Sequence, residues 1–298
     1  MAIKYAPPDA ESTIHERSRA VDMHIILTGA TGTVGLPVLR LLLADPTVTR
    51  VTALSRKAFD APEWEEDNLN LEKSEETSKD ANGKANGHPK STYDPSKLEV
   101  IVHTDYASYP PELLERLRGA RAAIWAQGIS QTEAPKPEYE RITIDYPLAA
   151  ARAFAGLAGD DQPFTFVYVS GQLAMTSELT PVYFARVKGR AERLLTELAA
   201  TQPSELRVLH VRPGIVEVPK RHRPAAPGVR NAEIVLSPIF RWFAPGLLSP
   251  VGMVAEVLTD LAVRAGEGGK KAPESGTTVT SPQIKRWKTV RVAVGVKA

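Results

Sequence analysis

Residues 23–35 read MHIILTGATGTVG, and this stretch decides the fold of the chain. It begins as a short apolar strand, continues into glycines spaced three residues apart (Gly29, Gly32 and Gly35), and precedes a helical pattern over residues 36–44. A turn between a strand and a helix directs backbone N–H groups outward at the positive end of the helix dipole, which favours a bound phosphate. Glycine also lets a pyrophosphate approach the backbone, because no Cβ stands in the way. The stretch therefore predicts a phosphate-binding turn.

Composition narrows the class of protein. A length of 298 residues with 43% apolar side chains is enough for one large or two small domains with a substantial core. The 37 Lys and Arg residues nearly balance 35 Asp and Glu residues, so the charge of +2 does not indicate a nucleic-acid partner. The absence of cysteine excludes disulfides, thiolate–zinc sites and cysteine nucleophiles, and it fits a reducing compartment.

The chain contains no sign of a membrane span or leader in its sequence pattern. No run reaches the roughly 18 uninterrupted apolar residues that a membrane helix needs. Residues 1–22 are rich in acidic side chains and lack the apolar segment of a secretory signal, so we interpret them as an N-terminal tail. We expect a cytoplasmic protein.

Strand and helix patterns alternate along the rest of the chain. The further predicted strands are residues 48–54, 98–103, 122–126, 164–169 and 206–211, and the predicted helices are residues 111–117, about 138–157 and about 180–198. Six strands separated by helices predict an α/β fold, a Rossmann-like doubly wound parallel sheet. In such sheets ligands bind at the carboxyl ends of the strands, so the residues just after each strand are the candidates for function.

We expect residues 23–298 to form one domain with two additions. The polar residues at about 63–97 carry too little apolar surface to offset the entropy of ordering, which predicts a disordered surface insertion. Residues at about 215–290 are too few for a large second domain, and we interpret them as a small C-terminal cap on the substrate side. This cap would include the aromatic patch at 239–243 and a helix over 250–265.

The motifs together resemble a known superfamily. The turn at Thr28–Gly35, Ser170, the region of Tyr183 and Lys188, and residues 212–214 (Arg-Pro-Gly) are similar to the short-chain dehydrogenase/reductase superfamily in its extended or atypical branch. The nearest likeness is to NmrA-like and nucleoside-diphosphate-sugar epimerase-like NAD(P)-binding proteins. It covers about residues 23–290, apart from the insertion.

The resemblance implies a set of cofactor contacts. It places an aspartate such as Asp105 against the adenine and the loop after the fourth strand against the ribose and nicotinamide. The second strand ends in Ser55 and Arg56 rather than in an acidic residue, and a guanidinium there favours the 2′-phosphate of NADP(H) over NAD(H). The predicted cofactor-binding residues are Gly29, Thr31, Gly32, Thr33, Val34, Gly35, Ser55, Arg56, Asp105, Ala126, Gln127, Gly128, Lys188 and Pro213.

The catalytic residues that the resemblance implies are Ser170, Tyr183 and Lys188. In the superfamily a tyrosine hydroxyl transfers the proton, a lysine four residues later lowers the pKa of that tyrosine and holds the ribose, and a serine polarises the substrate oxygen. Here Phe184 stands at that spacing and Tyr183 lies one residue earlier, which turns the hydroxyl by about 100° around a regular helix. A π-bulge between Tyr183 and Lys188 would restore the alignment. Without one, Lys188 would still bind ribose and Tyr183 would be a packing or pocket residue.

Three functions remain open from the sequence. The first is an NADPH-dependent reductase of a small carbonyl substrate, and the second is a non-catalytic NADP(H)-sensing regulator or scaffold of the NmrA-like type. The third, a sugar-nucleotide epimerase, is disfavoured by Arg56 and the short C-terminal part. We expect a small-molecule substrate and neither a nucleic-acid partner nor a metal. The sequence leaves the oligomeric state open, with a homodimer as one option. His24, His103 and His210 lack metal-ligand spacing and are interpreted as ordinary histidines in or beside strands.

Overall fold

The computed structural model describes residues 22–63, 92–159, 162–217, 248–266 and 273–287. Its main sheet has seven strands in the order β3-β2-β1-β4-β5-β6-β9, and all neighbouring strands are parallel. These strands are β1 (Met23–Thr28), β2 (Val48–Ser55), β3 (Leu98–Val102), β4 (Ala120–Trp125), β5 (Phe164–Val169), β6 (Leu206–Arg212) and β9 (Thr278–Thr280). A second, two-stranded sheet pairs β7 (Ile215–Glu217) with β8 (Leu248–Pro250). The predicted parallel α/β fold is confirmed.

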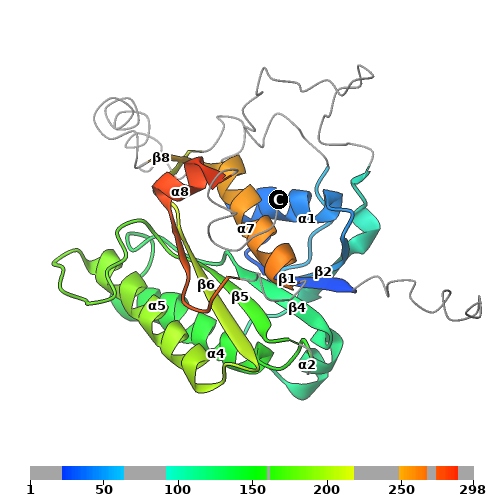
Figure 1. The fold of residues 1–298 in the computed structure, drawn as a ribbon, viewed down its shortest axis with the longest axis horizontal. Helices are drawn as coiled ribbons and strands as arrows, with labels where there is room; N and C mark the ends of the chain where they lie inside the picture. Colours follow the sequence, from blue (N-terminus) through cyan, green and yellow to red (C-terminus); the bar gives the residue numbers. More distant parts are fainter. Residues whose placement is uncertain (1–21, 64–91, 160–161, 218–247, 267–272, 288–298) are drawn as a thin grey trace, which may run out of the picture.

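Helices cover both faces of the main sheet (Figure 1). They are α1 (Gly35–Ala44), α2 (Pro111–Leu117), α3 (Lys136–Glu140), α4 (Tyr146–Phe154), α5 (Tyr183–Thr201), α7 (Val251–Gly266) and α8 (Ser281–Lys285). A 3-10 turn, η3 (Pro95–Lys97), precedes β3, and a π-helical turn, η4 (Arg141–Asp145), joins α3 to α4. Helices α1 and α7 lie on one face, and α2, α4 and α5 lie on the other.

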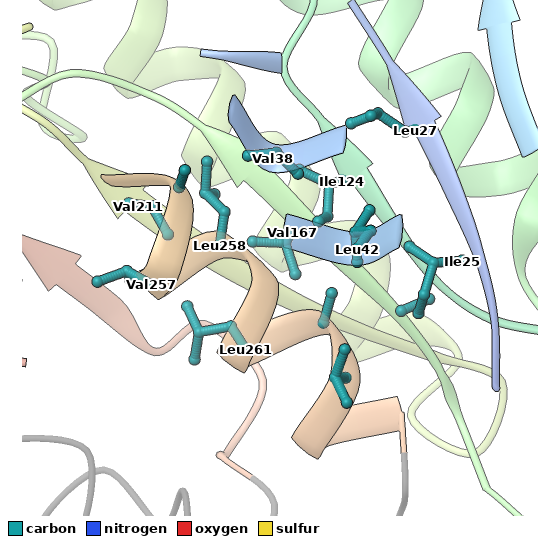
Figure 2. Packing of buried hydrophobic residues seen from close by; sticks show 14 of the residues in the cluster. Ile25, Leu27, Val38, Leu42, Ile124, Val167, Val211, Val257, Leu258 and Leu261 are labelled. Atoms are coloured by element: carbon teal, nitrogen blue, oxygen red, sulfur yellow. The ribbon is translucent and has the colours of Figure 1, made fainter. Parts of the chain in front are cut away.

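Alternating side chains of the strands fill two separate cores. On β1, Ile25 and Leu27 are fully buried in the core beneath α1 and α7, whereas Ile26 is fully buried in the core on the opposite face. Figure 2 shows Ile25, Leu27 and side chains of the neighbouring strands packed against α1 and α7. The two-residue period explains why these strands are almost continuously apolar, since both faces of the sheet are covered.

The C-terminal part contributes to the sheet itself. Helix α7, which the sequence analysis assigned to the cap, lies beside α1 and packs against β4 and β5. The short strand β9 pairs with β6 and adds a seventh strand that the sequence pattern did not reveal. The aromatic patch at 239–243 lies outside the described residues, as do residues 1–21 of the expected tail.

Part of the expected insertion is attached to the end of α1. The backbone N–H of Asp94 donates to the carbonyl oxygen of Leu43 at 3.0 Å, and the Thr92 hydroxyl donates to the carbonyl oxygen of Ala44 at 2.8 Å. Residues 64–91 fall outside the described ranges. The last residues of the expected insertion are therefore hydrogen-bonded to the domain from Thr92 onward, before β3 begins at Leu98.

The helical region expected at 138–157 is continuous but irregular. It runs through α3, η4 and α4, with Pro147 in the first turn of α4. Proline has no N–H to donate to the residue four positions earlier, Thr143. The hydroxyl of Tyr168 on β5 donates to that carbonyl oxygen instead, at 3.0 Å. The π-helical turn thus lies where proline interrupts the hydrogen-bond ladder.

In the parts of the chain that the structure describes, no helix has both the length and the apolar character needed to cross a membrane.

Candidate functional site

The glycine turn lies at the point where the order of the strands reverses. The chain proceeds from β1 outward to β2 and β3, and then crosses to β4 on the other side of β1. Ligands of doubly wound sheets bind at the carboxyl ends of the strands at such a switch point. Gly29 follows β1 here, and Ala126 and Gln127 follow β4.

Close backbone packing explains the glycines of the turn. Gly29 has a φ of +71°, and a Cβ on it would lie 2.6 Å from the carbonyl oxygen of Ala126. A Cβ on Gly35 would lie 2.0 Å from the carbonyl oxygen of Gly29. By contrast, a Cβ on Gly128 would meet nothing within 4 Å. The turn therefore brings the start of α1 and the ends of β1 and β4 closer together than side chains would allow.

The start of α1 has the features of an anion-binding helix end. Val34 precedes the helix and provides no side-chain cap, while the Gly32 N–H donates to the Gly29 carbonyl oxygen at 2.9 Å. Thr31 is exposed and Thr33 is half-buried. The residues present fit a dinucleotide phosphate, because Gly32 is exposed just before a helix N-terminus that no side chain caps.

The end of β2 provides an exposed cation next to the turn. β2 pairs with β1, and Arg56 follows its last residue, Ser55, with its side chain exposed. Burial raises the pKa of Tyr106 to about 12, and the positive charge of Arg56 acts in the opposite direction. The structure thus places Arg56 within electrostatic reach of the loop after β3.

The loop after β3 is held by its own hydrogen bonds. The Asp105 carboxylate is exposed and accepts a hydrogen bond from the Ala107 N–H at 3.1 Å. Tyr106 is buried at 2% exposure, and its hydroxyl donates to the carbonyl oxygen of Leu54 at 3.1 Å. Asp105 is therefore fixed in a turn whose anchor is the end of β2.

Ser170 and Lys188 lie together at the end of β5. The Lys188 ammonium donates to the carbonyl oxygen of Ser170 at 3.0 Å, and a Cβ on Gly171 would lie 3.4 Å from the Lys188 Cδ. Ser170 is 4% exposed, and its hydroxyl has no hydrogen-bond partner among the described residues. Burial lowers the pKa of Lys188 to about 8, although the nearby Glu192 carboxylate acts in the opposite direction.

Tyr183 lies apart from these two residues. It is the first residue of α5, which is α-helical from there to Thr201, so the π-helical turn of this protein lies in η4 and not between Tyr183 and Lys188. Its hydroxyl donates to the Glu140 carboxylate at 3.0 Å and to the carbonyl oxygen of Lys136 at 3.2 Å. Burial and Glu140 raise the pKa of this hydroxyl. The structure thus brings Ser170 and Lys188 together and directs Tyr183 toward α3.

Glu192 is a buried carboxylate that the sequence analysis did not single out. It is 1% exposed, and it accepts hydrogen bonds from the Arg212 Nε at 2.8 and 3.1 Å and from the Arg212 Nη2. Its position four residues after Lys188 places it on the same side of α5. The four-residue spacing to Lys188 could have indicated a carboxylate near the ammonium. Burial of Glu192 was not expected, because glutamates on helices are usually exposed to solvent.

A hydrogen-bond chain fixes Pro213 at the end of β6. The Gln172 N–H donates to the Pro213 carbonyl oxygen at 2.8 Å, and the Gln172 side-chain oxygen accepts from the Ser281 N–H at 2.7 Å. The hydroxyls of Ser281 and Ser249 are 2.8 Å apart, and the Gly214 N–H donates to the Ser249 hydroxyl at 3.0 Å. The start of α8 and the end of β8 thereby hold the loops after β5 and β6.

The three histidines occupy ordinary structural positions. The Nε2 of buried His24 is 2.8 Å from the Thr52 hydroxyl, and its Nδ1 is 2.8 Å from an Arg50 nitrogen. The Nε2 of buried His210 is 2.9 Å from the hydroxyl of Thr196. The ring of His103 packs among the aromatic rings of the loop that follows β3.

Two curated proteins are similar to parts of the chain. No protein-family profile matches it. The leucinostatins biosynthesis cluster protein T of Purpureocillium lilacinum is 33% identical over 195 residues, 65% of this chain, and the chain spans only 59% of that relative. The botcinic acid biosynthesis cluster B protein 16 of Botryotinia fuckeliana is 36% identical over 131 residues, which make up 41% of this chain and 81% of that protein. The chain belongs to the family of this botcinic acid cluster protein.

The chain is also similar in fold to several solved structures. The PhqB reductase domain of Penicillium fellutanum is 18% identical with a TM-score of 0.55, covering 96% of this chain and 74% of that chain. An oxidoreductase of the short-chain dehydrogenase/reductase family from Burkholderia thailandensis is 15% identical with a TM-score of 0.56. The match covers 91% of this chain and 97% of that protein. The enzyme WbmG of Bordetella bronchiseptica, in complex with NAD and UDP, is 14% identical with a TM-score of 0.51. The match covers 95% of this chain and 82% of that protein. The predicted Rossmann-like α/β fold, which these proteins share with the chain, is confirmed.

Proposed function

We propose that this protein is an NADP(H)-dependent reductase of a small carbonyl compound. The observation that carries the proposal is the tight glycine turn at the strand switch point. Gly29 and Gly35 pack too closely for side chains there, and exposed Gly32 precedes the uncapped start of α1. Ser170 and Lys188 add a hydroxyl and an ammonium at the end of β5. When bound, the reduced nicotinamide would supply a hydride, and these residues are suited to bind and protonate a carbonyl oxygen.

Each part of the cofactor has residues suited to hold it. The turn around Gly32 would bind the pyrophosphate, and exposed Arg56 would bind a 2′-phosphate. Asp105 would lie at the adenine, the loop at Ala126 would flank the ribose and nicotinamide, and Lys188 would reach the ribose. The names of similar proteins support a nicotinamide cofactor in general, because one is a reductase domain and another was solved with NAD.

The relatives also suggest the setting of the reaction. Two similar proteins are named for the leucinostatins and botcinic acid biosynthesis clusters. We therefore propose that the carbonyl substrate is an intermediate or product of a biosynthetic pathway encoded by a gene cluster.

Binding calorimetry with NADPH and NADH tests the cofactor assignment. We expect NADPH to bind at least tenfold more tightly than NADH, and Arg56→Ala to abolish this preference by weakening NADPH binding alone. The matched control is Arg118→Ala, because Arg118 is an exposed arginine that pairs with Glu115 just before β4 begins, at the other end of the sheet. Equal affinities for both cofactors in the wild type would contradict the assignment to NADP(H).

A second candidate function has an observation of its own. The Tyr183 hydroxyl is bound to Glu140 and Lys136 rather than directed to Lys188, which favours a protein that senses NADP(H) without turnover. Oxidation of NADPH measured over a panel of aldehydes and ketones separates the two. Tight binding without oxidation of NADPH by any member of the panel would favour the sensor and reject the reductase.

A further inference from the structure

The Tyr183 hydroxyl is already engaged on the far side of its helix. It donates to Glu140 and to the backbone of Lys136. The cationic groups of Lys136 and Arg186 lie 5.2 and 5.8 Å from the centroid of the Tyr183 ring. Because α5 is regular, the five residues from Tyr183 to Lys188 correspond to about 140° of rotation. The phenol and the ammonium therefore point in different directions.

The Lys188 ammonium has no carboxylate partner in the described ranges, although one lies a turn away. The nearby buried carboxylate, Glu192, is bound by the Arg212 guanidinium through several hydrogen bonds. The interaction that the structure gives the Lys188 ammonium is with the Ser170 carbonyl oxygen at 3.0 Å. An ammonium offers three donors, so it can also donate to a substrate oxygen.

The Ser170 side chain completes a two-donor site. Its hydroxyl is buried and has no partner among the described residues, although its own carbonyl holds Lys188. This hydroxyl is therefore free to donate to a ligand atom at the end of β5. Ser170 thus positions two donors, its own hydroxyl and, through its backbone carbonyl, the Lys188 ammonium. Two such donors can stabilise a carbonyl oxygen that gains negative charge during the reaction.

We propose that Lys188, rather than Tyr183, is the proton donor of the reduction, and that the Ser170 hydroxyl holds the substrate oxygen; this rests on the proposed function. As the carbonyl carbon receives the hydride, the C=O π bond becomes a C–O single bond. One N–H bond of the Lys188 ammonium breaks and a new O–H bond forms on the alcohol. The neutral amine then regains a proton from water. A lysine pKa of about 8 suits this exchange near neutral pH.

Lysine and tyrosine variants measured at saturating NADPH test the proposal. We expect Lys188→Ala to lower turnover at least hundredfold and methylammonium to restore part of it saturably, because the free amine replaces the lost donor. Lys188→Arg keeps the charge but not a transferable proton, so its turnover stays low. Tyr183→Phe retains most of the turnover. Arg190→Ala is the matched control, since Arg190 is an exposed cation on the same helix.

The pH dependence separates proton donation from ribose binding. Turnover at saturating NADPH falls as the pH rises past about 8, because the donor must be protonated. A Lys188→Ala variant that merely binds NADPH more weakly, with normal turnover at saturation, overturns the proposal. Loss of turnover in Tyr183→Phe overturns it as well.

A titration of Lys188 provides a readout that requires no turnover. In the cofactor-free protein with lysines labelled by 13C-methyl groups, the signal that disappears in Lys188→Ala reports its pKa by NMR. A value near 8 supports the proposal, whereas the ordinary value near 10.4 overturns it. A wild type that binds NADPH and reduces no carbonyl rejects the proposed function, whereas an active wild type with an active Lys188→Ala variant rejects only the role of Lys188.

Discussion

The hydroxyl of Tyr168 donates to the carbonyl oxygen of Thr143 at 3.0 Å, and this hydrogen bond joins β5 to the π-helical turn. Pro147, four residues after Thr143, has no N–H to offer that carbonyl. The tyrosine is 2% exposed, so water has little access to the pair. A strand side chain thus supplies the donor that the helix lacks.

We expect Tyr168→Phe to lower the free energy of unfolding by about 1–3 kcal/mol, because a buried carbonyl oxygen loses its donor. Urea denaturation followed by circular dichroism measures the change. The matched control is Tyr109→Phe, since the Tyr109 hydroxyl is buried without a partner in the described part of the chain. Equal losses in both variants would contradict this role of Tyr168.

Gly35→Ala should damage both the turn and cofactor binding. The new Cβ would lie 2.0 Å from the Gly29 carbonyl oxygen, which forces the backbone of the turn to move. We expect a loss of about 1–3 kcal/mol in stability and a weakening of NADPH binding of at least tenfold. Gly128→Ala has open space at its Cβ and should unfold at the wild-type temperature. Thermal unfolding with and without NADPH compares the two variants.

Stability should fall as the pH decreases below about 6.5. Burial, aided by the positive charge of Arg50, lowers the pKa of His24 to about 4, and burial lowers that of His210 to about 4. Between the ordinary histidine pKa near 6.5 and about 4, the unfolded chain binds protons that the folded chain does not, so acid favours unfolding. We expect the free energy of unfolding to drop by about 3–4 kcal/mol between pH 7 and pH 5.

Urea denaturation at several pH values measures this drop, and NMR of the histidine rings provides the direct check. Two ring signals should stay unchanged between pH 7 and pH 5 in the folded protein. Titration of every histidine ring near pH 6.5 would rule out this explanation.

Removing only one member of the Glu192–Arg212 pair should lower the free energy of unfolding more than removing both. Glu192→Leu leaves the partly buried Arg212 guanidinium without its carboxylate, and we expect a loss of about 3–5 kcal/mol. The double variant Glu192→Leu/Arg212→Met removes both charges and should be more stable than Glu192→Leu alone. Urea denaturation of the wild type, both single variants and the double variant gives the coupling energy. Additive losses would show that the pair does not act as a unit.

The strands that form the middle of the sheet could be predicted, because each is a compact apolar run bounded by turn residues. β5, for example, has the predicted bounds. β9 contributes only three residues, Thr278–Thr280, to the sheet, and such a short run does not differ from a loop in sequence. The pattern of α7 predicted a helix, but amphipathic spacing does not reveal which face of a sheet a helix will cover.

The candidate site was predictable where backbone geometry determines it. The glycines of the turn follow from the strand–turn–helix order, and the angular offset of Tyr183 follows from helix geometry. The partners of the Tyr183 hydroxyl on α3 could not be predicted, since they depend on how α3 and α5 pack together. Glu192 was missed for a similar reason, because its burial depends on Arg212 reaching it from β6.

The pairing of β9 with β6 has a consequence for the order of folding. Val211 on β6 meets Val279 on β9, so this edge of the sheet closes only after the segments between them have been synthesised. Until then the backbone N–H and C=O groups along β6 form an open template for strands of other chains. Once it has been made, β9 therefore covers a strand edge that would otherwise remain open to pairing with other chains.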